Sequence, residues 1–462
     1  MTHDIVIIGG GTAGLVTAAG AVALGAKAAL VEREALGGDC LWTGCVPSKA
    51  LIAFARLHRE AGSVQRETWP GAVEWLRSAQ ARIAPHDSPE RFRGLGVDVV
   101  FGSARLVGPG HVDVDGRSLR AKRLVIATGA APTVPPVDGL ETAGYLTHRT
   151  AFDQETLPPS LTIIGGGPIG LEFAQTYARL GVQVTVVEFL PEVLPRETPE
   201  AARLIRERLV AEGVCVHTGV RIVRVACEDG AKVVYGGGGA GERFAAAELL
   251  VATGRRPDLG ALEPGRAGVE LDRGAVVVDR RLRTTTRGIW AAGDVTGGPQ
   301  FTHAAEYMAR VVVQNALTPI PAKVDYGLVP RVTFTDPEVA AVGLTAQEAA
   351  AAGVRHEVHR YDFAGLDRAV TDGADIGFAM VVTRPNGKIL GATIVGRAAG
   401  ELLLPLVLAM RHGIPLSRLA TAIYPYPTMS EVTKRAAQGW YRERYGDTWR
   451  GRLLRRVVRW WL

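Results

Sequence analysis

Residues 5–14 read IVIIGGGTAG, an apolar strand that runs into a glycine pattern of the form G-x-G-x-x-G. The same unit recurs at residues 161–170, which read LTIIGGGPIG. The glycines of the two patterns are Gly9, Gly11 and Gly14, and Gly165, Gly167 and Gly170. Glycine allows the tight turn and lets a pyrophosphate approach the backbone at the N-terminus of the following helix. Two such units in one chain predict two dinucleotide-binding domains.

An acid follows each glycine unit at the same distance. Glu32 and Glu188 each come 18 residues after the last glycine, at the end of a second apolar segment, residues 28–31 and 184–187. A carboxylate at this place accepts hydrogen bonds from ribose hydroxyls. The charge of Glu188 would repel a 2′-phosphate, so the second site favours NADH over NADPH, although Arg196 lies close enough in sequence to weaken the preference.

A cysteine pair follows the first glycine unit. Residues 37–49 read GGDCLWTGCVPSK, with four residues between Cys40 and Cys45. That gap permits a small disulfide ring, and a helix N-terminus or a nearby cation lowers the pKa of such a thiol. Pro47 suits a helix start directly after Cys45, and Lys49 supplies a positive charge. The pattern predicts a redox dithiol that exchanges electrons with a flavin. We therefore expect FAD at the first glycine unit and the hydride donor at the second.

Composition excludes several classes of protein. A length of 462 residues exceeds one typical core and predicts about three domains. The net charge of +6 is mild and the body of the chain has no long basic run, so nucleic acid is not an expected partner. Four cysteines are too few for a secreted disulfide scaffold, and no apolar run approaches the roughly 18 residues of a membrane span. The strand-like segment that begins at Asp4 leaves no room for a signal peptide, so we expect a cytoplasmic location.

Three further apolar segments end in turns. Residues 125–127 precede Thr128 and Gly129, residues 250–253 precede Gly254, and residues 289–292 precede Gly293 and Asp294. From about residue 331, alternating segments such as 331–334 and 379–382 predict a mixed α/β third domain.

With these motifs the chain resembles the class I, FAD-dependent pyridine nucleotide–disulfide oxidoreductases, and among them the mercuric reductases and dihydrolipoamide dehydrogenases. The resemblance implies an α/β fold of two Rossmann-like dinucleotide-binding domains, for FAD and NAD, and a C-terminal α+β dimerisation domain. The expected parts are an FAD domain at 1–150 and 272–330, an NAD(P) domain at 151–271, a dimerisation domain at 331–445 and a tail at 446–462.

The resemblance also implies roles for single residues. Cys40 is expected to meet the acceptor and Cys45 to lie against the flavin, with Lys49 and Glu172 forming an ion pair beside it. The expected FAD-binding residues are Gly9, Gly11, Gly14, Glu32, Lys49, Thr128, Gly129, Gly293 and Asp294. The expected NAD(P)-binding residues are Gly165, Gly167, Gly170, Glu188 and Gly254. Cys215 and Cys227 match no family motif and are predicted to be buried core thiols.

One departure from the family pattern concerns the acceptor. Tyr426 stands where the family carries a histidine that the partner subunit supplies, while the accompanying acid is kept as Glu431. We therefore expect a homodimer in which these two residues complete the other subunit's site. A tyrosine titrates near 10 and is a poor base at neutral pH. This counts against efficient lipoamide or glutathione chemistry, and mercuric reductases share the tyrosine.

The expected electron path runs from NADH, or NADPH, through FAD to the Cys40–Cys45 disulfide and on to an acceptor. That acceptor is a metal ion in transient contact with the two sulfurs, a disulfide or a quinone-like oxidant, and no structural metal is expected. Mercury-specific members usually add a C-terminal vicinal cysteine pair, which this sequence lacks. Two alternatives remain open: a dihydrolipoamide dehydrogenase that tolerates tyrosine, and a membrane-associated redox sensor with little turnover.

The final segment, residues 449–462, carries five arginines among apolar residues. On a helix, four arginines fall on one side, and Trp449, Leu453, Leu454, Val457, Trp460 and Trp461 fall on the other. Such a helix suits peripheral contact with an anionic membrane surface, here the inner one. The alternatives are a helix that docks on the dimer and a solvated terminus.

Overall fold

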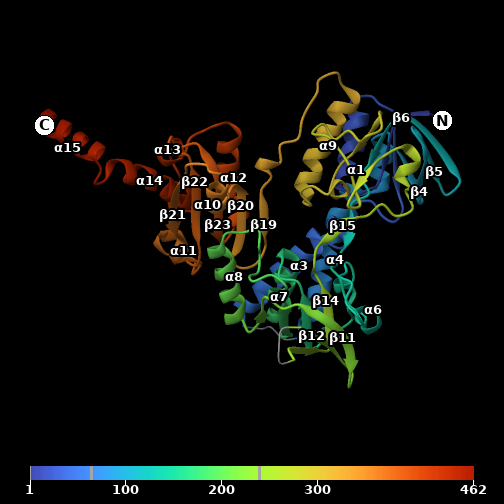
Figure 1. Ribbon diagram of the computed structural model, residues 1–462, viewed down its shortest axis with the longest axis horizontal. Helices are drawn as coiled ribbons and strands as arrows, with labels where there is room; N and C mark the ends of the chain where they lie inside the picture. The colour runs from blue at the N-terminus through green and yellow to red at the C-terminus, as the bar shows by residue number, and fades with distance from the viewer. Residues whose placement is uncertain (1, 63–65, 238–240) are drawn as a thin grey trace. The chain divides into compact units, whose positions relative to one another are not determined.

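The computed structural model describes residues 2–62, 66–237 and 241–462 and forms two compact units (Figure 1). The first unit comprises Met1–Pro191 and Glu212–Tyr326, and the second comprises Glu192–Ala211 and Gly327–Leu462. Residues 192–211 lie inside the predicted NAD(P) domain, yet they group with the second unit. Within that unit Glu197 Oε1 pairs with Arg331 Nε at 2.6 Å, and Glu200 Oε2 with Arg360 Nη1 at 2.8 Å.

The first sheet is built from segments before and after the second glycine unit. Its parallel strands run in the order β3 (Asp98–Phe101), β2 (Ala28–Glu32), β1 (Thr2–Ile8), β6 (Arg117–Ile126) and β18 (Ile289–Ala291). Two antiparallel strands, β5 (His111–Val114) and β4 (Ala104–Gly108), extend it from the other half of β6. Ile5, Val6 and Ile7 are fully buried, as expected for a parallel sheet covered on both faces.

The second sheet repeats this plan around the second glycine unit. Its four parallel strands are β10 (Cys215–His217), β9 (Gln183–Val187), β8 (Ser160–Ile164) and β14 (Glu248–Val251). An antiparallel sheet accompanies it, formed by β11 (Ile222–Glu228), β12 (Ala231–Gly236) and β13 (Arg243–Ala246). Two short pairs complete the strands of this unit: β15 (Arg255–Pro257) with β7 (Ala130–Pro132), and β16 (Leu271–Asp272) with β17 (Ala275–Val276).

The helices of the first unit follow the strands as the glycine patterns predict. They are α1 (Thr12–Ala23), α2 (Gly38–Trp42), α3 (Cys45–Glu60), α4 (Trp69–Ile83), α5 (Pro89–Gly94), α6 (Leu140–Ala143), α7 (Pro168–Arg179) and α9 (Thr302–Leu317). α1 and α7 begin directly after the two glycine turns and have the same length of 12 residues, so the sequence repeat is also a structural repeat.

The second unit is built on one antiparallel sheet. Its strands run in the order β19 (Arg331–Thr333), β20 (Glu338–Gly343), β23 (Ile389–Gly396), β22 (Phe378–Thr383) and β21 (Glu357–Asp362). Its helices are α8 (Pro199–Ala211), α10 (Ala346–Ala351), α11 (Asp367–Thr371), α12 (Ala399–Arg411), α13 (Leu416–Thr421), α14 (Glu431–Tyr445) and α15 (Trp449–Trp461). The core joins the sheet to α12 and α14 through residues such as Ala392, Leu406 and Val432. The predicted fold class, α/β with an α+β third domain, is confirmed.

Candidate functional site

The first glycine turn is a cradle that no larger residue fits. Gly9 has φ +111°, and a Cβ there would lie 2.2 Å from the carbonyl oxygen of Ala127 on the neighbouring strand end. A Cβ at Gly14 would lie 1.8 Å from the oxygen of Gly9. The turn therefore closes tightly against the start of α1, whose first N–H groups face outward from the helix end. Such a helix start binds a phosphate or another anion.

The second turn repeats this geometry closely. Gly165 has φ +115°, with a Cβ 2.5 Å from the oxygen of Ala252, and a Cβ at Gly170 would lie 2.1 Å from the oxygen of Gly165. The structure thus has two glycine turns of the same build, each leading into a helix N-terminus.

The two acids predicted to bind ribose hydroxyls accept hydrogen bonds from the backbone of their own glycine turns. Glu32 Oε2 accepts from the Gly10 N–H at 2.6 Å, and Glu188 Oε2 accepts from the Gly166 N–H at 2.5 Å. Glu188 is buried, and its Oε1 accepts a second bond from the Leu190 N–H at 2.7 Å. A carboxylate has about four acceptor sites, so Glu188 keeps capacity for further donors.

The region after the first sheet also fits a nucleotide. Thr128 Oγ1 is buried and has no hydrogen-bond partner among the described residues. Because buried polar atoms normally have a partner, this hydroxyl fits a position beside a bound ligand. Gly129 and Gly254 have φ of +77° and +119° and open space where a Cβ would lie, whereas Gly293 has φ +83° and a Cβ there would lie 3.3 Å from the Ala13 Cβ. These positions keep the backbone open at the strand ends, where open α/β sheets bind ligands.

The two thiols lie where the short helix α2 is followed by the longer helix α3. Cys40 lies in α2, and Cys45 is the first residue of α3, where the helix N-terminus favours an anion. Both are free thiols, Cys40 partly buried and Cys45 exposed. Cys45 Sγ lies 3.4 Å from Thr302 Oγ1, at the start of α9.

The pair is strongly polarised. A hydrogen bond from Cys40 lowers the pKa of Cys45 to about 6, and the Thr302 hydroxyl and the Lys49 charge act in the same direction against burial and Glu172. The same hydrogen bond, with burial, raises the pKa of Cys40 above its ordinary range. Both shifts act in the same sense and favour the negative charge on Cys45 over Cys40.

Lys49 joins the thiol helix to the second glycine helix. Its Nζ lies 2.8 Å from Glu172 Oε2, and Glu172 is buried on α7. Lys49 is one turn after Cys45 on α3, so its charge reaches the thiolate while its ion pair fixes α3 against α7. The structure brings these predicted partners together.

An arginine that sequence reasoning missed bridges two acids beside the thiols. Arg255 Nη2 lies 2.6 Å from Asp39 Oδ2, and Arg255 Nη1 lies 2.8 Å from Asp294 Oδ2. Burial raises the pKa of Asp39, but the nearby His148 and the charges of Arg255 and Arg149 outweigh it and hold the pKa below its usual range. Burial raises the pKa of Asp294, with Arg255 opposing the change.

The arginine bridge links elements that are distant in sequence. Asp39 is the neighbour of Cys40, and Asp294 follows β18. The sequence signal was the arginine directly after Gly254. Its role depends on the pairing of β15 with β7, which the sequence pattern did not predict.

Tyr426 and Glu431 belong to the second unit. The Tyr426 hydroxyl donates to Asp367 Oδ2 at 2.9 Å, and this bond, with the Asp367 charge, raises the pKa of the phenol. Tyr426 is 68% exposed, so the ring is accessible while its proton is held. Glu431 is buried at the first residue of α14. Their role toward the thiols remains a prediction.

The prediction for the other two cysteines was wrong. Cys215 and Cys227 are exposed rather than buried. Both lie on strands as expected, but β10 and β11 are edge strands of their sheets, where one flank of the strand faces solvent.

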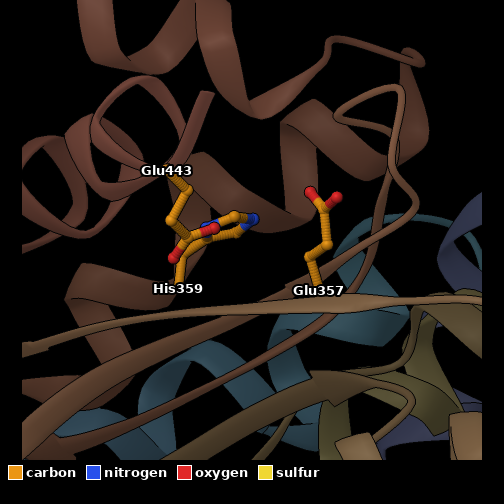
Figure 2. A group of neighbouring side chains, drawn as sticks. All are labelled: Glu357, His359 and Glu443. Carbon is orange, nitrogen blue, oxygen red and sulfur yellow. The ribbon is translucent and has the colours of Figure 1, made fainter. Parts of the chain in front are cut away.

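A second cluster of ionisable side chains lies in the second unit (Figure 2). His359 on β21 is fully buried, with Nδ1 at 3.2 Å from Glu443 Oε2 and Nε2 at 2.9 Å from Thr383 Oγ1. Glu357 shares the strand but pairs with Arg444 Nη2 at 2.9 Å. Because an arginine already neutralises Glu357, we interpret the cluster as an ion-pair network that ties the end of α14 to β21.

Comparison with known proteins assigns the chain to a family. Residues 3–309 match the family described as pyridine nucleotide-disulphide oxidoreductase, and residues 329–437 match its dimerisation domain. The chain belongs to this family. Its members are FAD-dependent and take electrons from NAD(P)H, and the dimerisation domain indicates a homodimer.

Mercuric reductases and dihydrolipoyl dehydrogenases are both similar to this oxidoreductase over nearly all of its length. A mercuric reductase of Streptomyces lividans is 36% identical, covering 94% of this chain and 96% of its own. A dihydrolipoyl dehydrogenase of Thermus scotoductus is 35% identical, covering 96% and 98%. The HOCl-induced flavoprotein disulfide reductase RclA from Escherichia coli, solved also as a Cu(II) complex, has a TM-score of 0.87 at 30% identity, covering 94% and 99%. The predicted class I membership is confirmed.

Proposed function

We propose that this oxidoreductase passes electrons from NAD(P)H, through FAD and the Cys40–Cys45 pair, to a thiophilic metal ion. The observation that carries the proposal is the thiol pair, in which Cys45 lies at the first residue of α3 and 3.4 Å from Thr302 Oγ1, and in which the pKa of Cys45 is lowered and that of Cys40 raised. Soft thiolate ligands select soft metal ions. The names of a mercuric reductase relative and of a Cu(II) complex among similar structures support the same acceptor class.

The residues that would hold the cofactors follow from the two cradles. FAD would lie at the first turn, with Glu32, Thr128, Gly129, Gly293 and Asp294 around it, and Lys49 near the ring. When bound, it supplies the two-electron relay between nicotinamide and disulfide. The nicotinamide nucleotide would lie at the second turn. We propose NADH as the better donor, because the buried Glu188 carboxylate would repel a 2′-phosphate.

The thiols would act in different roles. Reduction of the disulfide leaves the Cys45 sulfur as thiolate, stabilised by the Cys40 thiol, by Thr302 and by Lys49. Binding of a metal ion releases the proton of Cys40, so that both sulfurs contact the metal ion. For an ion that takes two electrons, the balance is NAD(P)H and M²⁺ giving NAD(P)⁺, M⁰ and one proton. A one-electron ion such as Cu(II) requires two ions per nicotinamide.

Tyr426 and Glu431 would complete the site of the partner subunit. The phenol keeps its proton through the bond with Asp367, so it serves as a donor and not as a base. Metal reduction needs no proton transfer to or from the acceptor, whereas thiol–disulfide exchange with lipoamide moves protons in both directions and is best served by a group that titrates near neutral pH. The tyrosine therefore favours a metal ion over lipoamide. We also propose that the enzyme acts in the cytoplasm.

Two alternatives are less well supported. A dihydrolipoamide dehydrogenase fits the relatives of that name but would have to work without the imidazole base. A redox sensor would also use a low-pKa thiol beside a second cysteine, and it differs from the proposed enzyme in having little turnover with any acceptor.

Steady-state NADH oxidation by the holoenzyme distinguishes these functions. Hg(II) and Cu(II) should accelerate it above the oxygen-dependent background, while lipoamide, glutathione disulfide and quinones should accelerate it far less. A Cys40→Ser/Cys45→Ser variant with normal flavin content is the control for reduction by the flavin alone. Faster oxidation with lipoamide than with either metal ion would contradict the proposal, and acceleration by none of these acceptors would favour the sensor.

A further inference from the structure

Helix α15 exposes apolar side chains that folded proteins normally bury. Trp449, Trp460 and Trp461 are 64%, 84% and 82% exposed. Leu453, Leu454, Val457 and Val458 on the same helix are also exposed, and Gly451 is its buried residue. Figure 1 shows α15 extending from the end of α14, away from the sheet of its unit. Exposed apolar patches of this kind mark binding surfaces.

The helix has two faces of different chemistry. At 3.6 residues per turn, Arg452, Arg455, Arg456 and Arg459 lie within an arc of about 100°. The tryptophans, leucines and valines occupy the opposite half of the circumference. Arg450 lies at the N-terminal edge of the apolar half, with its guanidinium 5.4 Å from the centre of the Trp449 ring. α15 contains no acid. Residues 446–462 hold five arginines and one aspartate and so contribute 5 − 1 = +4 of the chain's net charge of +6.

We propose that α15 binds an anionic membrane surface. The helix would lie in the plane of the interface, with its tryptophans and leucines in the headgroup region and its arginines toward lipid phosphates. Its 13 residues measure about 20 Å, short of the roughly 30 Å hydrocarbon core. In the part of the chain that the structure describes, no helix is long and apolar enough to cross a membrane. The binding is therefore peripheral.

Charge selects this occupant over others. A second copy of α15 would cover the apolar face but, because the helix contains no acid, would offer no counter-charge to the arginines. A nucleic-acid duplex bound to the arginine face would leave the three tryptophans of the opposite face in water. An anionic lipid surface satisfies both faces at once.

The end of α14, which leads into α15, is fixed to the sheet of the second unit. The Arg444 guanidinium pairs with Glu357 and stacks 4.2 Å from the Trp440 ring centre, while Glu443 faces His359 (Figure 2). Thr448 caps α15 by accepting from the Gly451 N–H at 3.2 Å. The tail thus starts from a fixed point on the second unit.

Co-sedimentation of the full-length holoenzyme with lipid vesicles tests the proposal. The enzyme should bind vesicles of equal parts phosphatidylglycerol and phosphatidylcholine, release them at high salt, and ignore pure phosphatidylcholine. Arg455→Glu/Arg456→Glu should lower the partition coefficient by at least about tenfold. The matched control is Arg411→Glu/Arg418→Glu, which changes charge equally on exposed arginines of the same unit. It should bind like the wild type.

A second variant tests the apolar face. Trp460→Ser/Trp461→Ser should lose vesicle binding while its flavin content and NADH oxidation stay normal, which shows that the fold is intact. Equal binding by wild type and both tail variants would overturn the proposal. So would equal binding to neutral vesicles, equal loss in the control pair, or a tail-dependent change in oligomeric state without vesicle binding.

Discussion

The polarisation of the thiol pair gives the sharpest prediction. The hydrogen bond from Cys40 is the largest influence that lowers the pKa of Cys45, so removing that donor should raise this pKa most. Cys40→Ala removes the donor, whereas Cys40→Ser keeps a hydroxyl in its place. We expect the two variants to differ, although neither can form the disulfide.

The expected size follows from the pKa itself. With a pKa of about 6, Cys45 is about nine-tenths thiolate at pH 7, compared with about 3% for an ordinary thiol of pKa about 8.5. We expect Cys40→Ala to raise the pKa of Cys45 by at least about one unit, so that the thiolate share at pH 7 falls to about half or less. Cys40→Ser should remain near the wild-type value.

The assay is alkylation of Cys45 by iodoacetamide as a function of pH, followed by mass spectrometry of the peptide. Cys215 and Cys227 are exposed and would consume the reagent, so the background should carry Cys215→Ser/Cys227→Ser. Because the thiolate is the reactive form, alkylation and metal binding should both be present above pH 6 and fall as the pH drops through about 6.

Two results would refute this reasoning. One is an identical midpoint for the Cys40→Ala and Cys40→Ser variants, which would mean that Cys40 does not hold the thiolate. The other is a wild-type midpoint near that of an ordinary thiol. Two macroscopic steps are expected in the wild type, because the thiols titrate as a coupled pair.

Three further predictions concern the cradles, the ion pair and the tyrosine. Gly14→Ala should abolish bound FAD, and Gly170→Ala should keep FAD but weaken NADH binding, because a Cβ at either position would clash with the glycine turn. Gly94→Ala, where a Cβ meets open space, is the control and should change neither ligand. Flavin absorbance and NADH titration measure the two ligands, and loss of both in both cradle variants would contradict the separate roles. Lys49→Met should raise the pKa of Cys45 by less than Cys40→Ala does. It should also lower the free energy of unfolding by about 1–3 kcal/mol, because the Glu172 carboxylate stays buried without the lysine. An unchanged denaturation midpoint would show that the ion pair does not stabilise the fold. Tyr426→His should raise kcat/KM for the oxidation of dihydrolipoamide at neutral pH by at least about tenfold, because the imidazole can accept the thiol proton, and an unchanged rate would show that the tyrosine is not what disfavours this substrate.

Local geometry explains what the sequence could predict. Short-range backbone constraints set the glycine turns, the helix starts that follow them, and the two acids, Glu32 and Glu188, after the second strand of each unit. The sequence pattern alone therefore located them. Lys49 and Glu172 required the family resemblance, because nothing in their own spacing brings α3 to α7.

Features that depend on long-range pairing were missed. Arg255 reaches Asp39 and Asp294 only because β15 pairs with β7 and β18 returns to β6. The burial of Cys215 and Cys227 was mispredicted because thiols are usually buried, whereas exposure depends on their edge position in the sheets.

The central claim is that electrons reach a metal ion through Cys40 and Cys45. Its most direct test is anaerobic rapid mixing of the holoenzyme, reduced by one equivalent of NADH, with Hg(II) or Cu(II). Reduction should produce a long-wavelength absorbance band from the Cys45 thiolate beside the flavin. The metal ion should remove the band and reoxidise the enzyme at a rate that matches turnover, and Cys45→Ala should show neither. A band that persists with either metal ion, or reoxidation at an equal rate in Cys45→Ala, would contradict the account.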